Sequence, residues 1–372
     1  MRRMLLILLK ILLSIICLLL ISALALYFYA VREAGTPPTD QELAKYQHLP
    51  YFQNGRFTAW QDLPYEPEKT VGKGWFGQPN SPNKPPKPFP MVMLNKNDFA
   101  AKPSEDFVYY WLGHSSAIME LAGTRFIVDP VFGRASPIPF LMPRFQVPPL
   151  ARSELPALDF VLITHDHYDH LEAATIRHFA KNPPHFIVPL GLGSRLKSFG
   201  IPAEKITEIG WGDTTEFGNL SISAEPDLHY SQRLLKDRNR TLWAAYVVAH
   251  KSEKNDKRVQ IFIAGDGGYS EHFRKIGEKY QHFDAALIEI DAGNPGWKNT
   301  HMLPEAAVQA AKDINTDLML PVHWGAYDLA LHPWGESIEK TIQAATEQNI
   351  NLQIPQMGEK FKLGDVKKNK WW

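Results

Sequence analysis

The sequence predicts an α/β protein in which two β-sheets carry helices on their outer faces, behind a single N-terminal transmembrane helix. Three observations predict this architecture. The chain starts with a long apolar stretch, short β-rich segments recur after residue 105 with helical stretches between some of them, and the string THDHYDHL directly follows one β-rich segment. A hydrophobic content of 44% and an aromatic content of 12% suit a chain of 372 residues that buries a sizeable core.

The N-terminal apolar stretch predicts a membrane anchor over residues 1–31. Residues 11–31 contain no charged side chain, and one bilayer span needs about 20 apolar residues. Arg2, Arg3 and Lys10 lie on the amino side, so the positive-inside rule places the N-terminus in the cytoplasm and the rest across the membrane, which is the periplasm in a Gram-negative bacterium. A cleavable signal peptide is the alternative, because small residues near the end of the stretch suit a cleavage site.

Proline-rich sequence follows the apolar stretch and predicts a stalk or extension with little regular structure over residues 32–104. The string NSPNKPPKP at 80–88 cannot form a regular element, because proline lacks the backbone N–H and fixes φ. The main domain is expected at 105–364. Residues 365–372 form a basic and aromatic tail, for which a solvated end is the favoured interpretation and contact with lipid headgroups the alternative.

Segments rich in β-branched and aromatic residues predict the strands of the main domain. They lie at 107–111, 125–128, 160–163, 186–188, 220–223, 243–248, 259–263, 285–290 and 318–320. Helices are expected at 171–180, 304–313 and 336–348, and Pro304 suits a first helical turn. Strands that first run in meander and then mix with helices favour two sheets with helices outside.

Charge and cysteine usage exclude several classes of protein. Lys and Arg total 40, and so do Asp and Glu, so the zero net charge argues against a nucleic-acid-binding protein or nuclease. Cys17 is the only cysteine, which excludes a disulfide framework and a thiolate-built metal site. The chain contains no Gly-x-Ser-x-Gly string, which disfavours a serine nucleophile.

The string THDHYDHL, residues 164–171, predicts a metal site. Imidazoles and carboxylates at the end of a core strand are expensive to bury unless a metal ion compensates them. Alternation along an extended turn aims His165 and His167 at one metal, while Asp169 and His170, expected at the start of the following helix, face a second one. Zinc and its neighbours accept imidazole and carboxylate ligands.

Further candidate ligands follow other predicted strands. Asp266 lies in AGDGG at 264–268, where glycines let the backbone approach a metal or substrate and the carboxylate can bridge two ions. His229 and His323 also follow strands. A lone histidine at a strand end is more often a hydrogen-bonded structural group, but the shared position of these residues favours one common site with 164–171.

These motifs resemble the metallo-β-lactamase fold of metal-dependent hydrolases, and within it the N-acyl-phosphatidylethanolamine-hydrolysing phospholipase D family and its bacterial relatives. Besides THDHYDHL, the resemblance is carried by WLGHSS (111–116), DPVF (129–132), RASP (134–137), SELP (153–156), VPLGL (188–192), AGDGGY (264–269) and VHWG (322–325). It covers roughly residues 109–361. The resemblance implies an αββα sandwich with the site at one edge of the two sheets.

The resemblance also implies which residues bind two metal ions. The first ion would be held by three histidines: His165, His167 and His229. The second would be held by a carboxylate and two histidines: Asp169, His170 and His323. Asp266 would bridge the two ions.

Other positions match supporting or catalytic residues of the family. His301 matches a histidine that helps to bind or protonate substrate, and His114 and Asp129 match supporting positions near the metals. The loop 291–297, expected over the substrate, departs from the family pattern. This departure leaves the metal ligands unchanged and bears on headgroup recognition.

The implied activity is that of a zinc-dependent phosphodiesterase. Two zinc ions would convert a bridging water into hydroxide near neutral pH for attack on a phosphodiester, and manganese or iron would accept the same ligands. A membrane anchor favours a membrane phospholipid as substrate, and the preferred one is N-acyl-phosphatidylethanolamine, cleaved to phosphatidic acid and N-acylethanolamine. The alternatives are a lactonase or other ester hydrolase of the same fold, and a non-enzymatic metal-binding membrane protein.

Overall fold

In the computed structural model the described residues are 2–60, 82–251, 258–294, 297, 299–330, 332–366 and 370–372. Parts of three predicted segments therefore lie outside the described residues: 61–81 of the extension, 295 and 296 of the substrate loop, and 367–369 of the tail. The statements below concern the described part of the chain.

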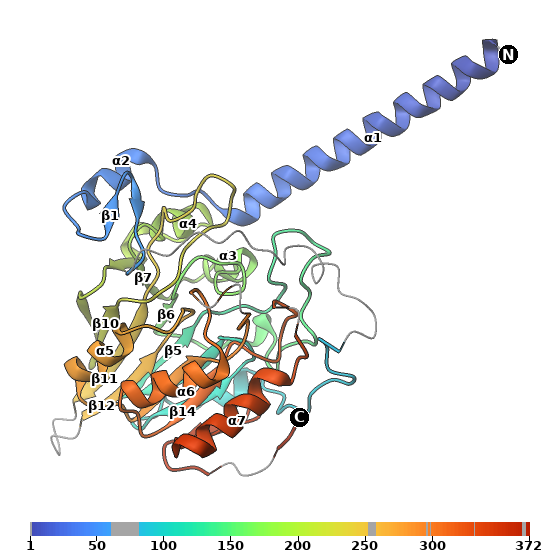
Figure 1. Cartoon of the computed structure of the whole chain (residues 1–372). Coiled ribbons are helices and arrows are strands. Elements are labelled where there is room, and N and C mark those ends of the chain that lie inside the picture. The colour runs from blue at the N-terminus through green and yellow to red at the C-terminus, as the bar shows by residue number, and fades with distance from the viewer. Residues whose placement is uncertain are drawn as a thin grey trace.

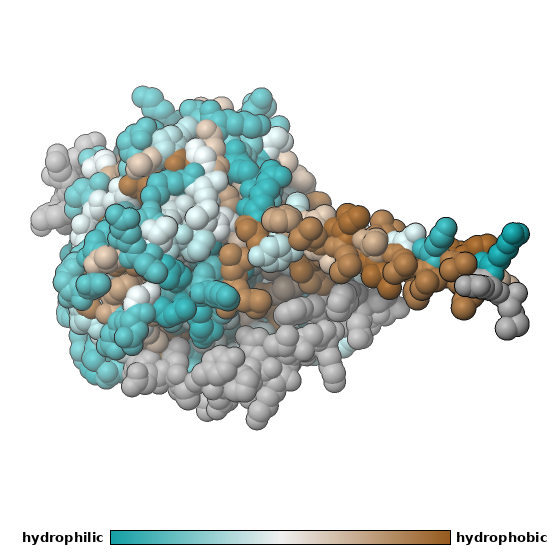
Figure 2. Space-filling view, turned by 90° about the horizontal axis from the view of Figure 1, so that it is seen from above, coloured by the Kyte–Doolittle hydropathy of each residue, from teal (hydrophilic) through white to brown (hydrophobic). Residues whose placement is uncertain are grey.

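A single long helix, α1 (Arg2–Ala34), extends away from the rest of the molecule (Figure 1). Within the described residues it is the one helix that is long and apolar enough to cross a membrane, a test that a signal sequence also passes. Figure 2 shows hydrophobic residues along α1, whereas the face of the body in that view is largely hydrophilic. The helix runs a few residues beyond the predicted anchor.

Part of the predicted extension is folded onto the body. It contains η2 (Lys96–Phe99), α2 (Asp40–Leu43), η1 (Ala44–Tyr46) and the short hairpin of β1 (Phe52–Gln53) and β2 (Arg56–Phe57). Thr39 caps α2, because its hydroxyl accepts from Glu42 N and the Glu42 carboxylate accepts from Thr39 N. Phe52 and Phe57 are buried in the same core as the sheets.

The larger sheet has seven strands in the order β15-β3-β4-β5-β6-β7-β8. Their bounds are β3 (Val108–Trp111), β4 (Ala117–Leu121), β5 (Thr124–Val128), β6 (Phe160–Leu162), β7 (His185–Pro189), β8 (Ile206–Ile209) and β15 (Lys360–Lys362). β15, β3, β4 and β5 pair antiparallel, and β5 to β8 pair parallel.

The second sheet has six strands in the order β14-β13-β12-β11-β10-β9. Their bounds are β9 (Thr214–Phe217), β10 (Leu220–Glu225), β11 (Ala245–Lys251), β12 (Arg258–Ile263), β13 (Ala285–Glu289) and β14 (Met319–Val322). β9 to β12 form an antiparallel meander, and β12 to β14 pair parallel.

Alternation along the strands divides the core into layers. In β4, Met119 belongs to the large core that also holds the second sheet, whereas Ile118 points to a second core with Ile176 of α3 (Ala173–Phe179) and Leu196 of α4 (Gly193–Ser198). Helices α5 (His272–Tyr280), α6 (Pro304–Asp313) and α7 (Glu336–Gln348) pack on the second sheet through the large core. The four layers confirm the predicted αββα sandwich, and α6 and α7 have the predicted bounds.

The C-terminal residues differ from the favoured expectation of a solvated end. Trp371 packs against Trp324, with ring centroids 5.7 Å apart, and its Nε1 donates to Ile354 O at 2.9 Å. Trp372 lies 5.5 Å from Trp324. Burial of aromatic surface explains this placement, because a solvated end would leave both indoles in water.

Candidate metal centre

The predicted ligands gather at one edge of the two sheets, where four strands end. The segment 164–171, called the metal loop below, follows β6, and the other ligands follow β10, β12 and β14: His229, Asp266 and His323. Because β6 lies in one sheet and the other three strands lie in the second, both sheets contribute side chains to the same site.

One detail of the predicted site is corrected. The sequence places Asp169 and His170 at the start of a helix, but α3 begins only at Ala173 and both residues lie in a turn. The backbone N–H groups of His170 and Leu171 donate to His167 O at 3.1 and 2.8 Å. This turn folds the metal loop back on itself, so that His165 and His170 both lie near Asp266, with their Nε2 atoms 3.8 and 3.0 Å from its Oδ2.

The first cluster consists of His165, His167 and His229. The Nδ1 atom of His167 lies 2.9 Å from His165 Nε2 and 3.1 Å from His229 Nε2. The outer nitrogen atoms are held by neutral oxygens, since His229 Nδ1 bonds Thr300 O at 2.9 Å and His165 Nδ1 bonds Thr164 Oγ1 at 3.0 Å. Three ring nitrogens therefore converge, which is the arrangement that holds a metal ion in many histidine sites.

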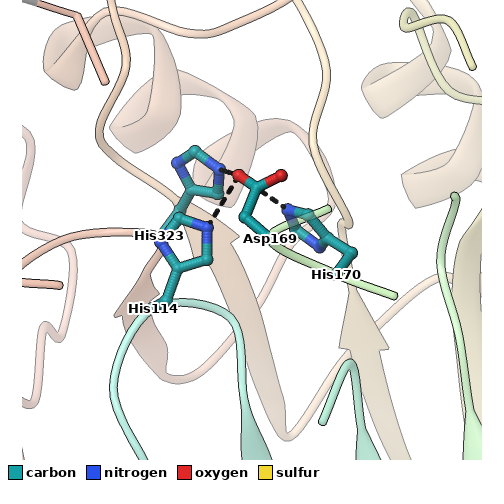
Figure 3. Close-up of side chains that lie close together, drawn as sticks. All are labelled: His114, Asp169, His170 and His323. Atoms are coloured by element: carbon teal, nitrogen blue, oxygen red, sulfur yellow. Dashed lines mark hydrogen bonds and ion pairs between the residues drawn. The ribbon is translucent and has the colours of Figure 1, made fainter. Parts of the chain in front are cut away.

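The second cluster consists of Asp169, His170 and His323, and His114 joins it (Figure 3). Asp169 Oδ2 lies 3.7 Å from His170 Nε2, 3.6 Å from His323 Nε2 and 3.0 Å from His114 Nε2. The three imidazoles come from different parts of the fold and point toward this one carboxylate.

Asp266 lies between the clusters. Its Oδ2 is 3.0 Å from His170 Nε2, 2.9 Å from His323 Nε2 and 3.8 Å from His165 Nε2. All these side chains are buried, yet the Oδ1 atom of Asp266 has no hydrogen-bond partner.

These contacts fit metal ions. Ligand atoms bound to one zinc at about 2.1 Å lie roughly 3.4 Å from one another, which is close to the spacings within both clusters. Buried polar atoms without partners are costly and call for a compensating group, and imidazole nitrogen with carboxylate oxygen is a donor set for zinc, manganese or iron. The residues present therefore fit two ions, one at each cluster.

Burial and charge act differently on the two clusters. Burial lowers the pKa of His165 and His229 well below the ordinary histidine value and that of His167 to about 4, which keeps these rings in the neutral form that binds metal. For His323, burial opposes the charged ring, but the Asp266 carboxylate outweighs it and raises the pKa to about 10. The carboxylates that favour a proton on this ring favour a bound cation in the same place.

Outer carboxylates orient the ligands. Asp129 Oδ2 accepts from Thr164 Oγ1 at 2.6 Å and lies 2.7 Å from His170 Nδ1, so Asp129 turns His170 Nε2 toward the site. Glu289, the last residue of β13, was not singled out in the sequence. Its Oε2 lies 2.8 Å from His301 Nδ1 and 3.9 Å from His323 Nδ1.

His301 borders the first and second clusters. Its ring lies 5.3 Å from the ring of His229 and 5.3 Å from that of His323. Its side chain keeps 13% of its surface exposed, whereas the side chain of His323 has none. Burial opposes charge on the ring, but the Glu289 carboxylate outweighs it and raises the pKa of His301.

The backbone at the site is strained. His114, Asp129 and His323 have φ values of 54°, 42° and 70°, in the left-handed region that side chains other than glycine rarely adopt. The glycine next to Asp266 also has a specific role, because a Cβ at Gly267 would lie 2.0 Å from Asp227 Oδ1. This glycine therefore allows two loops to pack closely, rather than opening space for a metal.

The first residue of the predicted substrate loop has a structural partner. Asp291 Oδ1 accepts from Ser337 Oγ at 2.7 Å and lies 2.7 Å from His332 Nε2. These bonds fix the start of the loop to α7. Farther along, the ring of Trp297 lies 6.1 Å from the ring of His301.

Comparisons with known proteins agree with this geometry. Residues 124–324, which contain the seven predicted ligands but not His114, match the family model described as the beta-lactamase superfamily domain. The chain is 35% identical to an uncharacterised protein of Mycobacterium tuberculosis over 301 residues, which cover 79% of this chain and 78% of that protein. It is 36% identical over 233 residues to a Caenorhabditis elegans protein named N-acyl-phosphatidylethanolamine-hydrolyzing phospholipase D 1, covering 59% of this chain and 64% of that protein.

A solved structure shares the fold. The isothiocyanate hydrolase from Delia radicum gut bacteria superposes with a TM-score of 0.54 at 20% sequence identity, covering 69% of this chain and 99% of that one. The family model matches more than half of the chain and the clusters offer buried histidine and carboxylate ligands. The chain therefore belongs to the β-lactamase superfamily and is a metal-dependent hydrolase with the metallo-β-lactamase fold.

Proposed function

We propose that this hydrolase is a phosphodiesterase of the phospholipase D type that acts on membrane phospholipids. The proposed substrate is N-acyl-phosphatidylethanolamine, and the products are phosphatidic acid and N-acylethanolamine. The observation that carries the proposal is the pair of ligand clusters joined by Asp266, because two adjacent cations suit the charged oxygens of a phosphodiester. The name of the C. elegans relative and the membrane-length helix α1 support a lipid substrate.

The ligand assignment is part of the proposal. One ion would be held by the first cluster and the other by the second cluster, with Asp266 shared between them. Zinc is the first choice, and manganese or iron would accept the same ligands. When bound, two such ions supply Lewis acidity and lower the pKa of a coordinated water toward neutrality.

The chain's own residues would then complete the chemistry. Glu289 holds His301 through Nδ1, and its charge raises the pKa of the ring, which favours a protonated Nε2 that can donate to the leaving alkoxide. Asp129 and Glu289 keep the ligands turned toward the ions, and the buried clusters limit access of bulk water.

The domain limits and location follow from the same reasoning. Residues 1–31 form the anchor, 32–104 the extension, 105–364 the catalytic domain and 365–372 the tail. The N-terminus lies in the cytoplasm and the catalytic domain lies across the membrane, in the periplasm if the host is a Gram-negative bacterium.

Mass spectrometry of lipid products tests the proposal. Detergent-purified protein with zinc should release phosphatidic acid and N-acylethanolamine from N-acyl-phosphatidylethanolamine, and the Asp266→Ala variant should not. Asp317→Ala is the matched control, since that carboxylate is 71% exposed and lies outside both clusters. If the parent protein binds two metals but forms neither product, the lipid assignment is wrong, and lactones and generic phosphodiesters become the next substrates.

A further inference from the structure

The C-terminal end of α1 is buried in the body of the protein. The last carbonyl groups of a helix lack partners within the helix and carry partial negative charge. Here Arg233 donates to Glu33 O at 2.7 Å and Ala34 O at 2.8 Å, and Arg195 donates to Ala34 O at 3.1 Å and Gly35 O at 3.2 Å. Ala34 has no exposed surface. α1 therefore meets the body at a rigid junction and not through a free linker.

The same two arginines hold the metal loop. Arg233 Nη1 donates to Asp166 O at 2.7 Å and Leu171 O at 2.8 Å, and Arg195 Nε pairs with Asp166 Oδ2 at 2.7 Å. The ring of Tyr168 lies 3.9 Å from the Arg233 guanidinium. Asp166 stands between two ligands of the first cluster, so one layer of side chains separates the end of α1 from the metal site.

A short loop projects from this junction. The junction loop, residues 234–236, runs between Arg233 and Asp237. Asp237 closes this loop, because its Oδ1 accepts from Arg233 N at 3.1 Å and from Leu234 N at 2.8 Å. Its Oδ2 pairs with Arg195 Nη2 at 2.7 Å, which ties the loop to the junction. At its centre Leu235 is 97% exposed, more than any other large apolar side chain in the described part of the chain.

The surroundings of Leu235 are basic. Lys236 is exposed, and Arg56 donates to Lys236 O at 3.4 Å and also to Arg238 O. The charge of Asp237 is directed inward to Arg195 and does not offset these cations at the surface. An apolar tip among cations suits an anionic lipid surface.

We propose that the junction loop contacts the bilayer beside α1, with Leu235 at the boundary of headgroups and acyl chains and the basic side chains at anionic headgroups. The position rests on the treatment of α1 as a membrane span, as in the proposed function. Since the arginine junction fixes the metal loop against α1, this contact turns the ligand edge of the sheets toward the membrane. The helix is thus an orienting element of the site as well as a tether.

Site-directed fluorescence on the full chain tests the contact. In a Cys17→Ser background, Leu235→Cys is labelled with an environment-sensitive dye and the protein is reconstituted into vesicles of phosphatidylcholine and phosphatidylglycerol. Nitroxide lipids labelled near the glycerol backbone should quench the dye, and aqueous iodide should quench it weakly. Val366→Cys is the matched control, because Val366 is an aliphatic residue that is 62% exposed and follows β15. The C-terminus of the chain lies away from α1 (Figure 1).

The outcomes are distinct. Quenching by nitroxide lipid at 235 but not at 366 supports the proposal. Equal iodide quenching at both positions with no nitroxide effect overturns it, and shielding from iodide without nitroxide quenching also overturns it in favour of a protein partner. None of these results depends on which lipid is cleaved, so failure of the proposed substrate is distinguishable from failure of the contact.

A second measurement connects the contact to turnover. Leu235→Ser should lower hydrolysis of N-acyl-phosphatidylethanolamine in vesicles several-fold, while hydrolysis of soluble bis(4-nitrophenyl) phosphate stays unchanged. An equal loss on both substrates would indicate damage to the site and would contradict a role limited to the membrane surface.

Discussion

The two ligand clusters on either side of Asp266 differ in charge. The first cluster is made of imidazoles alone, and its outer nitrogens bond to neutral oxygens such as Thr300 O. The second cluster contains Asp169 and is backed by the carboxylates Asp129 and Glu289. In a buried environment, a site with carboxylates attracts a cation more strongly than a site made of neutral rings. The second cluster should therefore hold its ion more tightly than the first. Asp266 is the carboxylate that both share.

Removal of the shared carboxylate should have the largest effect. In Asp266→Ala both clusters would lose their proposed shared ligand. Loss of an outer partner of a ligand lowers activity by up to roughly 100-fold, and we expect hydrolysis to fall by more than that here. Metal content, measured by inductively coupled plasma mass spectrometry, should fall below two ions per chain. Parent-like metal content and rate in this variant would show that Asp266 does not link the clusters.

Selective changes should separate the clusters. His167→Gln removes a side chain of the first cluster only, so one tightly held ion should remain after dialysis against a chelator. Loss of both ions from His167→Gln would contradict independent clusters.

Asp169→Asn removes the carboxylate charge within the second cluster and keeps the shape of the side chain. The chelator concentration that removes the second ion should then fall about tenfold, so that both ions leave at similar chelator concentrations.

Glu289→Gln tests the outer support of the second cluster. The amide can still accept from Gly267 N and Met302 N at the position of Oε1, but the charge beside His301 and His323 is lost. We expect a loss of about 10- to 100-fold in turnover and weaker binding of the second ion, with the first ion unchanged. Glu225→Gln is the control, since Glu225 is equally a buried strand carboxylate but bonds Lys279 instead. Equal losses in both variants would point to stability and not to support of the site.

These expectations also show what a sequence can reveal. Two sheets with helices outside were predictable because strand-like segments first run in meander and then mix with helical stretches, and the family resemblance implied the αββα sandwich. The predicted bounds of α6 and α7 match the observed ones, and Pro304 marks the first turn of α6. The common site of His229, Asp266 and His323 was predicted from their shared positions after strands.

Other features depended on tertiary contacts. Glu289 carries a weak signal, a single carboxylate inside the apolar run 285–290, and only the fold shows that it faces His301. The turn at Asp169 and His170 replaces an expected helix start because the metal loop closes on His167 O. The arginine junction joins residues about two hundred positions apart, at Glu33 and Arg233, which no local pattern encodes.

The smallest expected effect comes from a substitution at the C-terminus, which should weaken metal binding at the second cluster alone. Trp371 packs on Trp324, the residue that follows His323, so Trp371→Ala removes an aromatic contact worth about 1 kcal/mol and loosens the support of that ligand. We expect a lower melting temperature and a slightly weaker second ion, with the first ion unaffected. Trp60→Ala is the control, because Trp60 is half-buried and lies 6.4 Å from Trp211, in the extension rather than beside a ligand. If both variants lose stability but only Trp371→Ala weakens the second ion, the tail supports the more charged cluster. If neither variant changes metal binding, the packing of Trp371 against Trp324 stabilises the fold and does not support the metal site.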